Sequence, residues 1–152
     1  MDIRERFTSG VKTAMKAGDK RRVATLRMVQ AALKDKDIEA RGLGKTVGDD
    51  DILALLQKMV KSRQESLDIY EKAGRDDLAT QEREEIAIIQ EHLPQAMDET
   101  QMRAAIEAAI AQTGAAGMKD MGRVIAALRA EHAGRMDFAK ASAAVKALLA
   151  QN

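Results

Sequence analysis

The chain has 152 residues, of which 45% are hydrophobic, 32% charged and 2% aromatic, and its formal net charge is +1 at pH 7. This composition is typical of a globular protein and excludes a disordered chain, and the nearly neutral charge excludes a global field that would draw the protein onto nucleic acid. The absence of cysteine excludes disulfides, thiol catalysis and cysteine-based zinc sites.

The sequence predicts a cytoplasmic protein without a membrane partner. Its first ten residues are charged and lack the apolar stretch of a secretory signal. The longest apolar runs, such as residues 86–89 and 124–128, are far shorter than the about 20 residues that cross a membrane. The scarcity of aromatic side chains also argues against a module that stacks the bases of single-stranded RNA.

Apolar residues recur at helical spacing through the first part of the chain and predict four helices, over residues 2–17, 19–41, 49–73 and 75–91. Gly18 is expected to end the first helix and Asp19 to cap the second. The acidic run 49–51 opens the third helix, where carboxylates complement the helix dipole. Because successive helical positions point about 100° apart, we expect this run not to bind a metal.

Pro94 is the only proline, and the composition changes after it. Residues 95–152 contain 18 alanines and only 13 charged side chains. Three further helices are expected, over residues 98–113, from near Gly122 to 133, and over 137–149, with Asp98 and Gln101 as a capping box. The sequence therefore predicts an all-α protein, with an N-terminal four-helix domain in residues 1–93 and a C-terminal three-helix bundle in residues 94–152.

The residues that usually carry catalysis are sparse and scattered. His92 and His132 are the only histidines and neither lies in a metal-binding motif. The serines lack a nucleophile-elbow context, and there is no phosphate-binding loop motif. We therefore predict no catalytic residue, no metal and no cofactor.

Basic residues suggest two candidate surfaces in the first domain. On the second helix they recur every seven residues, at Lys20, Arg27, Lys34 and Arg41. A secondary basic patch is predicted from Arg27, Lys58, Lys61 and Arg63. Residues 1–93 hold 18 basic and 18 acidic side chains, so the favoured alternative is a solvated face whose cations are paired with nearby acids.

Gly122 raises a question, because glycine costs about 1 kcal/mol relative to alanine in a helix interior. Lys119 and Arg123 lie four residues apart beside it, and Arg135 and Lys140 flank the next turn. The glycine could let an anion approach the free N–H groups of a helix N-terminus. It could equally let the last helix pack closely against the backbone.

Several motifs together resemble the GatB/YqeY family along essentially the whole chain. In the first domain they are Lys61-x-Arg63-x-x-Ser66, then Tyr70, then Ala73-Gly74-Arg75-x-Asp77-Leu78. Leu93-Pro94 and Lys119-Asp120-Met121-Gly122-x-Val124 continue the pattern. Two positions depart from it: His92 stands where the family commonly has tyrosine, and Phe138 where it often has glycine.

The resemblance implies kinship with the tail of the GatB component of the tRNA-dependent amidotransferase, which amidates misacylated Glu-tRNA(Gln) or Asp-tRNA(Asn) with glutamine as nitrogen donor. In that assembly the tail helps to hold tRNA, and amide transfer belongs to other domains. No catalytic residue carries over. The implied RNA-binding candidates are Lys119, Asp120, Gly122, Arg123, Arg135 and Lys140.

We therefore expect a non-catalytic accessory module that binds tRNA or the aminoacyl-tRNA machinery, with no DNA partner. The alternative is a helical protein–protein adaptor with no RNA role, in which Gly122 serves helix packing. A small amidotransferase acting alone is least favoured, because no nucleophile–base pair is visible in the sequence.

Overall fold

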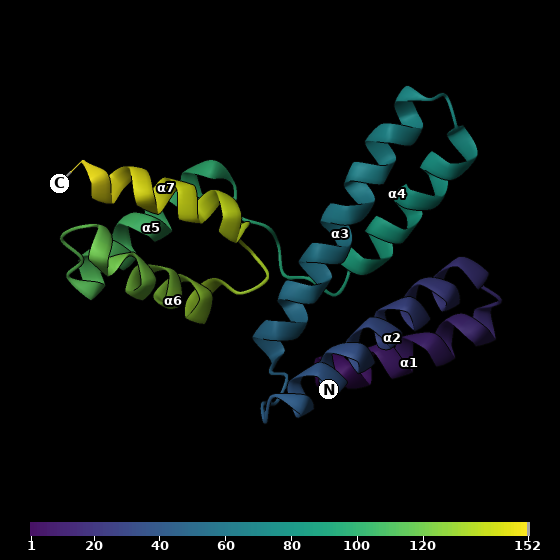
Figure 1. Cartoon of the computed structure of the whole chain (residues 1–152). Coiled ribbons are helices and arrows are strands. Elements are labelled where there is room, and N and C mark those ends of the chain that lie inside the picture. The colour runs from purple at the N-terminus through teal and green to yellow at the C-terminus, as the bar shows by residue number, and fades with distance from the viewer. Residues whose placement is uncertain (152) are drawn as a thin grey trace. The chain divides into compact units, whose positions relative to one another are not determined.

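The computed structural model describes residues 1–151, which form seven α-helices and one short 3-10 helix and contain no strand (Figure 1). The all-α prediction is confirmed. In chain order the elements are α1 (Ile3–Ala17), α2 (Lys20–Gly42), α3 (Asp49–Lys72), α4 (Asp76–Gln90), α5 (Glu99–Thr113), η1 (Met118–Asp120), α6 (Met121–His132) and α7 (Phe138–Ala150).

The fold divides after Leu93 into two compact units, Met1–Leu93 and Pro94–Asn152. Helices α1–α4 belong to the first unit, and α5, η1, α6 and α7 belong to the second. That each unit acts as a separate functional domain stays a prediction. Within residues 1–151, none of the helices has the length and apolar character needed to cross a membrane.

The core of the N-terminal unit follows the apolar stripes of the sequence. Helix α3 packs along α4, α1 packs along α2, and α2 also contacts α4. The buried members of this core are Phe7, Leu26, Val29, Leu33, Ile52, Leu56, Val60, Ile86, Ile88 and Ile89. Residues spaced three and four apart share one helix face, so each stripe faces the neighbouring helices.

Local capping fixes where the helices start and stop. Gly18 ends α1 in the left-handed conformation with φ of 71°, and Asp19 Oδ1 accepts a hydrogen bond from the Arg22 N–H at 3.1 Å. At the start of α3, Asp51 Oδ2 accepts from the Gly48 N–H at 2.9 Å. These contacts confirm the predicted caps, and the acidic run lies in the first turn of α3 as predicted.

The C-terminal unit is built from smaller side chains. Its buried core consists of Ile106, Ala109, Val124, Leu128, Met136, Ala141, Val145 and Leu149. Asp98 and Gln101 form the predicted capping box of α5. The Phe138 ring packs against this core with the Arg129 guanidinium 5.4 Å from its centroid, so this departure from the family pattern fills space inside the unit.

One buried ion pair joins α3 to α4. Arg63 Nε donates to Glu85 Oε2 at 3.1 Å, and the two side chains are only 16% and 8% exposed. Arg63 also donates to the Met59 carbonyl at 3.1 Å, and Glu85 accepts from Gln81 Nε2 at 3.2 Å. Arg63 therefore does not contribute to an exposed basic patch, because its charge is used inside the unit.

We expect Arg63→Ala to lower the free energy of unfolding by about 3 kcal/mol, because it leaves the Glu85 carboxylate buried without its cation. Arg83→Ala is a matched control: its ion pair with Glu71, at 2.8 Å, joins side chains that are half exposed. We expect the control to lose less than about 1 kcal/mol. Urea unfolding followed by circular dichroism measures both, and equal losses would contradict the structural role of the buried pair.

Candidate functional site

The connection from α5 to α6 is held together by the Asp120 carboxylate. Asp120 Oδ2 accepts from the Ala116 N–H at 2.9 Å, and Oδ1 accepts from Arg123 Nη2 at 2.6 Å. Arg123 Nη1 donates in turn to the Thr113 carbonyl at 3.0 Å, at the end of α5. The two side chains therefore fasten both ends of the connection and hold η1 at the start of α6.

The same contacts set the charge of Asp120. The Ala116 N–H and the Arg123 guanidinium both stabilise the carboxylate and lower its pKa from 3.8 to about 2. Asp120 therefore stays ionised to a lower pH than an ordinary aspartate, and its charge offsets that of Arg123. Both residues were predicted to face RNA. The Asp120 side chain is mostly buried, whereas the Arg123 side chain holds the loop and is still 59% exposed.

Gly122 lies in the first turn of α6 and is exposed. Apart from its chain neighbours and the backbone of its own helix, a Cβ atom built at this position would meet no heavy atom within 4 Å. The interpretation that the glycine lets another helix of this chain pack closely is therefore wrong. Within the described chain, the space in front of residue 122 is open.

Two exposed side chains precede this open position. Lys119 has no hydrogen bond or ion pair with any residue from 1 to 151, and Met118 is 44% exposed. We define the η1–α6 surface as Met118, Lys119 and Gly122. It combines one available cation, one apolar side chain and bare backbone on a segment that Asp120 and Arg123 hold in place.

The remaining C-terminal candidates lie near the other end of α6. Arg135 Nε donates to the Gln95 carbonyl at 2.9 Å, and the Arg135 carbonyl accepts from the Met97 N–H at 2.8 Å. Arg135 thus ties the α6–α7 loop to the segment before α5. Lys140 is exposed in the first turn of α7. Because α6 has 12 residues and is about 18 Å long, Arg135 lies about one helix length from the four candidates at the start of α6.

The secondary basic patch of the N-terminal unit is also divided. Arg63 is buried in its pair with Glu85. Arg27 is exposed and contacts only the Met15 Sδ, at 3.7 Å. Lys61 is exposed on α3 without an ion pair to any described residue, and Lys58 lines a pocket.

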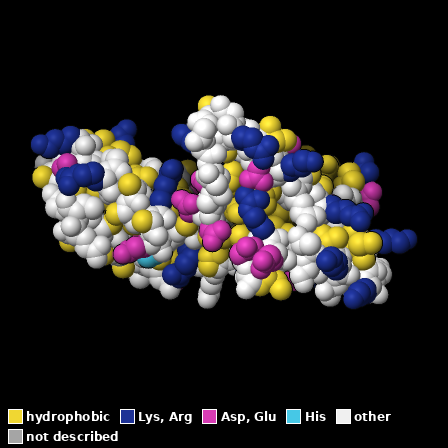
Figure 2. Space-filling view, turned by 90° about the horizontal axis from the view of Figure 1, so that it is seen from below, with side chains coloured by type: hydrophobic (Ala, Val, Ile, Leu, Met, Phe, Trp, Pro, Cys, Tyr) yellow, Lys and Arg dark blue, Asp and Glu magenta, His cyan; other side chains and the backbone are white. Residues whose placement is uncertain are grey.

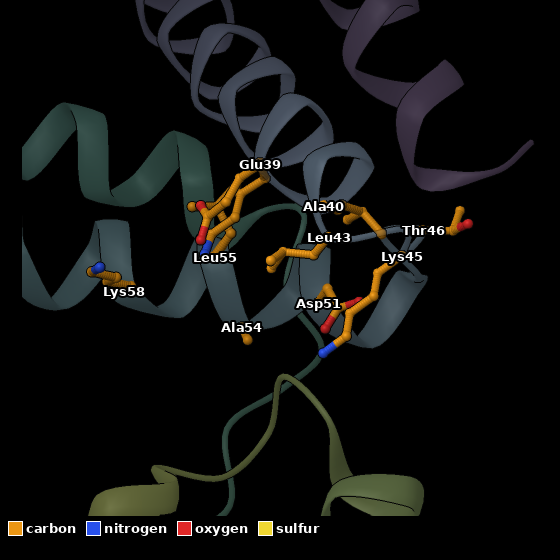
Figure 3. A pocket seen from close by; sticks show the side chains of 11 residues that line it. Glu39, Ala40, Leu43, Lys45, Thr46, Asp51, Ala54, Leu55 and Lys58 are labelled. Atoms are coloured by element: carbon orange, nitrogen blue, oxygen red, sulfur yellow. The ribbon is translucent and has the colours of Figure 1, made fainter.

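That pocket, of about 310 Å³, lies where α2 meets α3 (Figure 3). In Figure 3, Lys45 and Asp51 lie at one side and Lys58 at the other. The only hydroxyl in the lining is Thr46, and no histidine lies beside it. The full lining is Lys36, Glu39, Ala40, Leu43, Lys45, Thr46, Val47, Asp51, Ala54, Leu55 and Lys58. These side chains offer ionic and apolar contact and no nucleophile–base pair.

The histidine before Leu93-Pro94 has a packing role. The His92 ring meets the Phe7 ring edge-on, with 5.0 Å between centroids. Burial and the nearby Arg6 charge lower the pKa of His92, so the ring is neutral at pH 7. Among residues 1–151, no three His, Asp or Glu side chains are grouped so that they could hold a metal ion.

Sequence reasoning missed the structural role of the Asp120–Arg123 pair and the exposure of Met118. The sequence contains a signal for this ion pair, because an aspartate and an arginine three residues apart lie next to each other on a helix. No local signal distinguishes the exposed Met118 from the buried Met136, because both follow a glycine-containing turn.

Comparison with known proteins gives one family and several relatives. The model of the family described as Yqey-like protein matches residues 4–149. Relatives from Eremothecium gossypii and Lachancea thermotolerans, both named Altered inheritance of mitochondria protein 41, mitochondrial, are 35% identical over 83 residues and 34% identical over 85 residues. These alignments cover 55% and 56% of this chain and 44% of each relative. The chain thus matches less than half the length of these relatives.

The lowered pKa of Asp120 predicts how the C-terminal unit responds to acid. Folding favours the ionised form of Asp120, so the ionised carboxylate stabilises the folded unit. This contribution to the free energy of unfolding is fully present above pH 3.8, the ordinary pKa, and is lost as the pH falls toward about 2. Asp120→Asn should remove this acid-dependent loss and expose the Ala116 amide to hydrogen exchange. Exchange of the 115–123 amides, measured by NMR between these pH values, tests this; identical acid profiles for variant and wild type would contradict it.

Proposed function

The chain belongs to the YqeY-like family, and from this premise we propose that it is a non-catalytic accessory module that binds tRNA through the η1–α6 surface. The observation that carries the proposal is the open space at Gly122 beside the unpaired Lys119. A backbone without a side chain lets a phosphate or ribose come closer than any other residue would allow.

The held loop supports the same proposal. Asp120 and Arg123 fix the segment that carries Lys119, through bonds to Ala116 and Thr113. A surface that is ordered before binding avoids the entropy loss of ordering a loop on contact. Arg123 and Arg135 are positioning residues in this account, and Lys119 supplies the direct phosphate contact.

The ligand is proposed to be tRNA because of the family's kinship with the amidotransferase tail. The two phenylalanines also favour contact with the sugar–phosphate backbone over base stacking: Phe7 is buried, and Phe138 packs against the core of its unit. The third aromatic residue, Tyr70, is partly buried and lies in the other unit from the η1–α6 surface. The names of the relatives refer to the inheritance of mitochondria. The cytoplasmic location of this chain stays a prediction.

A second candidate function, a protein–protein adaptor, is favoured by one observation. Gly122, Ala126 and Ala130 follow one another along α6 at four-residue spacing and are all exposed, next to the exposed Met118. Because these side chains are small, a helix of another protein could pack closely against this face of α6. A partner that stays bound in a pull-down after nuclease treatment supports the adaptor, whereas one that is lost with the RNA supports the tRNA proposal.

Titration of the purified protein with tRNA at several salt concentrations tests the proposed function. Each phosphate contact contributes about −0.9 to the slope of log K against log salt concentration. We expect Lys119→Ala to weaken binding and to reduce the slope by about that amount.

Lys146→Ala is the control, because Lys146 is an exposed lysine of α7 without an ion pair to the described residues. We expect it to bind as the wild type does. The proposal fails if the wild-type protein does not bind tRNA at low salt, or if the two variants lose the same affinity.

A further inference from the structure

One face of α2 carries cations and no acids along the whole helix. Its positions alternate in spacing by four and three residues, which places them on a single side. All of them are exposed. We define the α2 outer face as Lys20, Ala24, Arg27, Ala31, Lys34, Ile38 and Arg41.

The four cations of this face are not neutralised by salt bridges. None of Lys20, Arg27, Lys34 and Arg41 forms a salt bridge with a residue in the range 1–151, and Arg27 contacts only a methionine sulfur. All four cations are exposed, which agrees with the predicted solvated face, but among residues 1–151 none is paired with an acid in a salt bridge.

Two of the three acids of α2 border this face. Asp35 lies four residues after Ala31, and Asp37 lies three residues after Lys34 and four before Arg41. Glu39 follows Ile38 by one position and lies about 100° further round the helix. Asp37 accepts two hydrogen bonds from the Arg4 guanidinium, at 2.7 and 2.9 Å. The hydrogen bonds of Asp37 thus go to α1, although the nearby Arg41 charge also helps to lower the pKa of the Asp37 carboxyl.

The spacing of the cations suits a ligand with repeated charge. Seven residues of helix separate successive cations by about 10.5 Å, which exceeds the Debye length of about 8 Å at physiological ionic strength. The cations therefore repel one another weakly, yet all four can contact a long polyanion. In the space-filling view of Figure 2, Lys and Arg side chains lie scattered over the visible face with Asp and Glu side chains among them.

We infer that the α2 outer face is a separate binding surface for the phosphate backbone of double-stranded RNA. The α2 outer face lies in the N-terminal unit and shares no residue with the η1–α6 surface. The inference is therefore independent of the tRNA contact proposed for the η1–α6 surface.

The residues of the face favour an RNA duplex over a membrane. A helix that lies on a membrane inserts a broad apolar face, but the apolar face of α2, with Leu26, Val29 and Leu33, is already buried in the core. The outer face offers only Ile38 as a large apolar side chain. It carries no aromatic ring on which unpaired bases could stack, whereas duplex RNA is recognised through its shape and its phosphates.

A matched pair of fourfold variants tests the inference. The first replaces the four cations of the α2 outer face: Lys20→Gln, Arg27→Gln, Lys34→Gln and Arg41→Gln. The control replaces four exposed lysines without ion pairs elsewhere: Lys12→Gln, Lys16→Gln, Lys72→Gln and Lys146→Gln. Both lower the net charge equally, and glutamine preserves helix propensity.

Fluorescence anisotropy with an RNA duplex of about 16 base pairs measures binding between about 50 and 200 mM salt. The inference predicts that the α2 variant loses about 3 to 4 units of the log–log slope and that the control keeps the wild-type slope. The double variant Arg27→Gln/Lys34→Gln should lose about half as much, and circular dichroism establishes that each variant is folded.

Equal losses in both fourfold variants, or no duplex binding by the wild type at the lowest salt, would overturn the inference. So would binding to phosphatidylserine vesicles that depends on the α2 cations while duplex binding does not. Lys119→Ala separates the two proposals: a loss of tRNA affinity in this variant alone concerns the η1–α6 surface, and a loss of duplex affinity in the α2 variant alone concerns the outer face.

Discussion

The ion pair between Asp120 and Arg123 is the interaction on which the surface at the start of α6 depends. It closes the α5–α6 connection onto itself through the Ala116 amide and the Thr113 carbonyl. Two donors lower the pKa of its carboxyl to about 2, so the carboxylate stays ionised to a lower pH than an ordinary aspartate. Asp120 and Arg123, which the sequence suggests as ligand contacts, thus hold the connection in place. Lys119 and the backbone at Gly122 remain exposed to solvent.

Arginine and lysine have different roles in this chain. Within residues 1–151, the cation of each salt bridge is an arginine or a histidine, as in Arg63–Glu85 and Arg4–Asp37, whereas the lysines are exposed and unpaired. The planar guanidinium binds a carboxylate and a carbonyl together, which suits it to joining helices, and the ammonium group stays hydrated at the surface. A chain with nearly equal numbers of acids and bases thus presents local rows of positive charge.

The helices were predictable because their signals are local. Gly18 and Asp19 mark one boundary, Asp98 and Gln101 mark another, and apolar spacing gives the buried face of each helix. Which cations remain available was not predictable, since their partners are distant in sequence. Arg63 meets Glu85 from the next helix, and Arg135 meets the Gln95 carbonyl 40 residues earlier. The two interpretations of Gly122 differed only in what lies in front of it, and this depends on the packing of the whole unit.

The central claim is that the open space at Gly122 serves a ligand, and Gly122→Ala tests it most directly by measuring stability and tRNA affinity on the same variant. The position has open space and no positive φ, so an alanine there should stabilise the unit by up to about 1 kcal/mol in urea unfolding. The account predicts that this more stable protein binds tRNA more weakly than the wild type. Unchanged or stronger tRNA binding by the stabilised variant would contradict it.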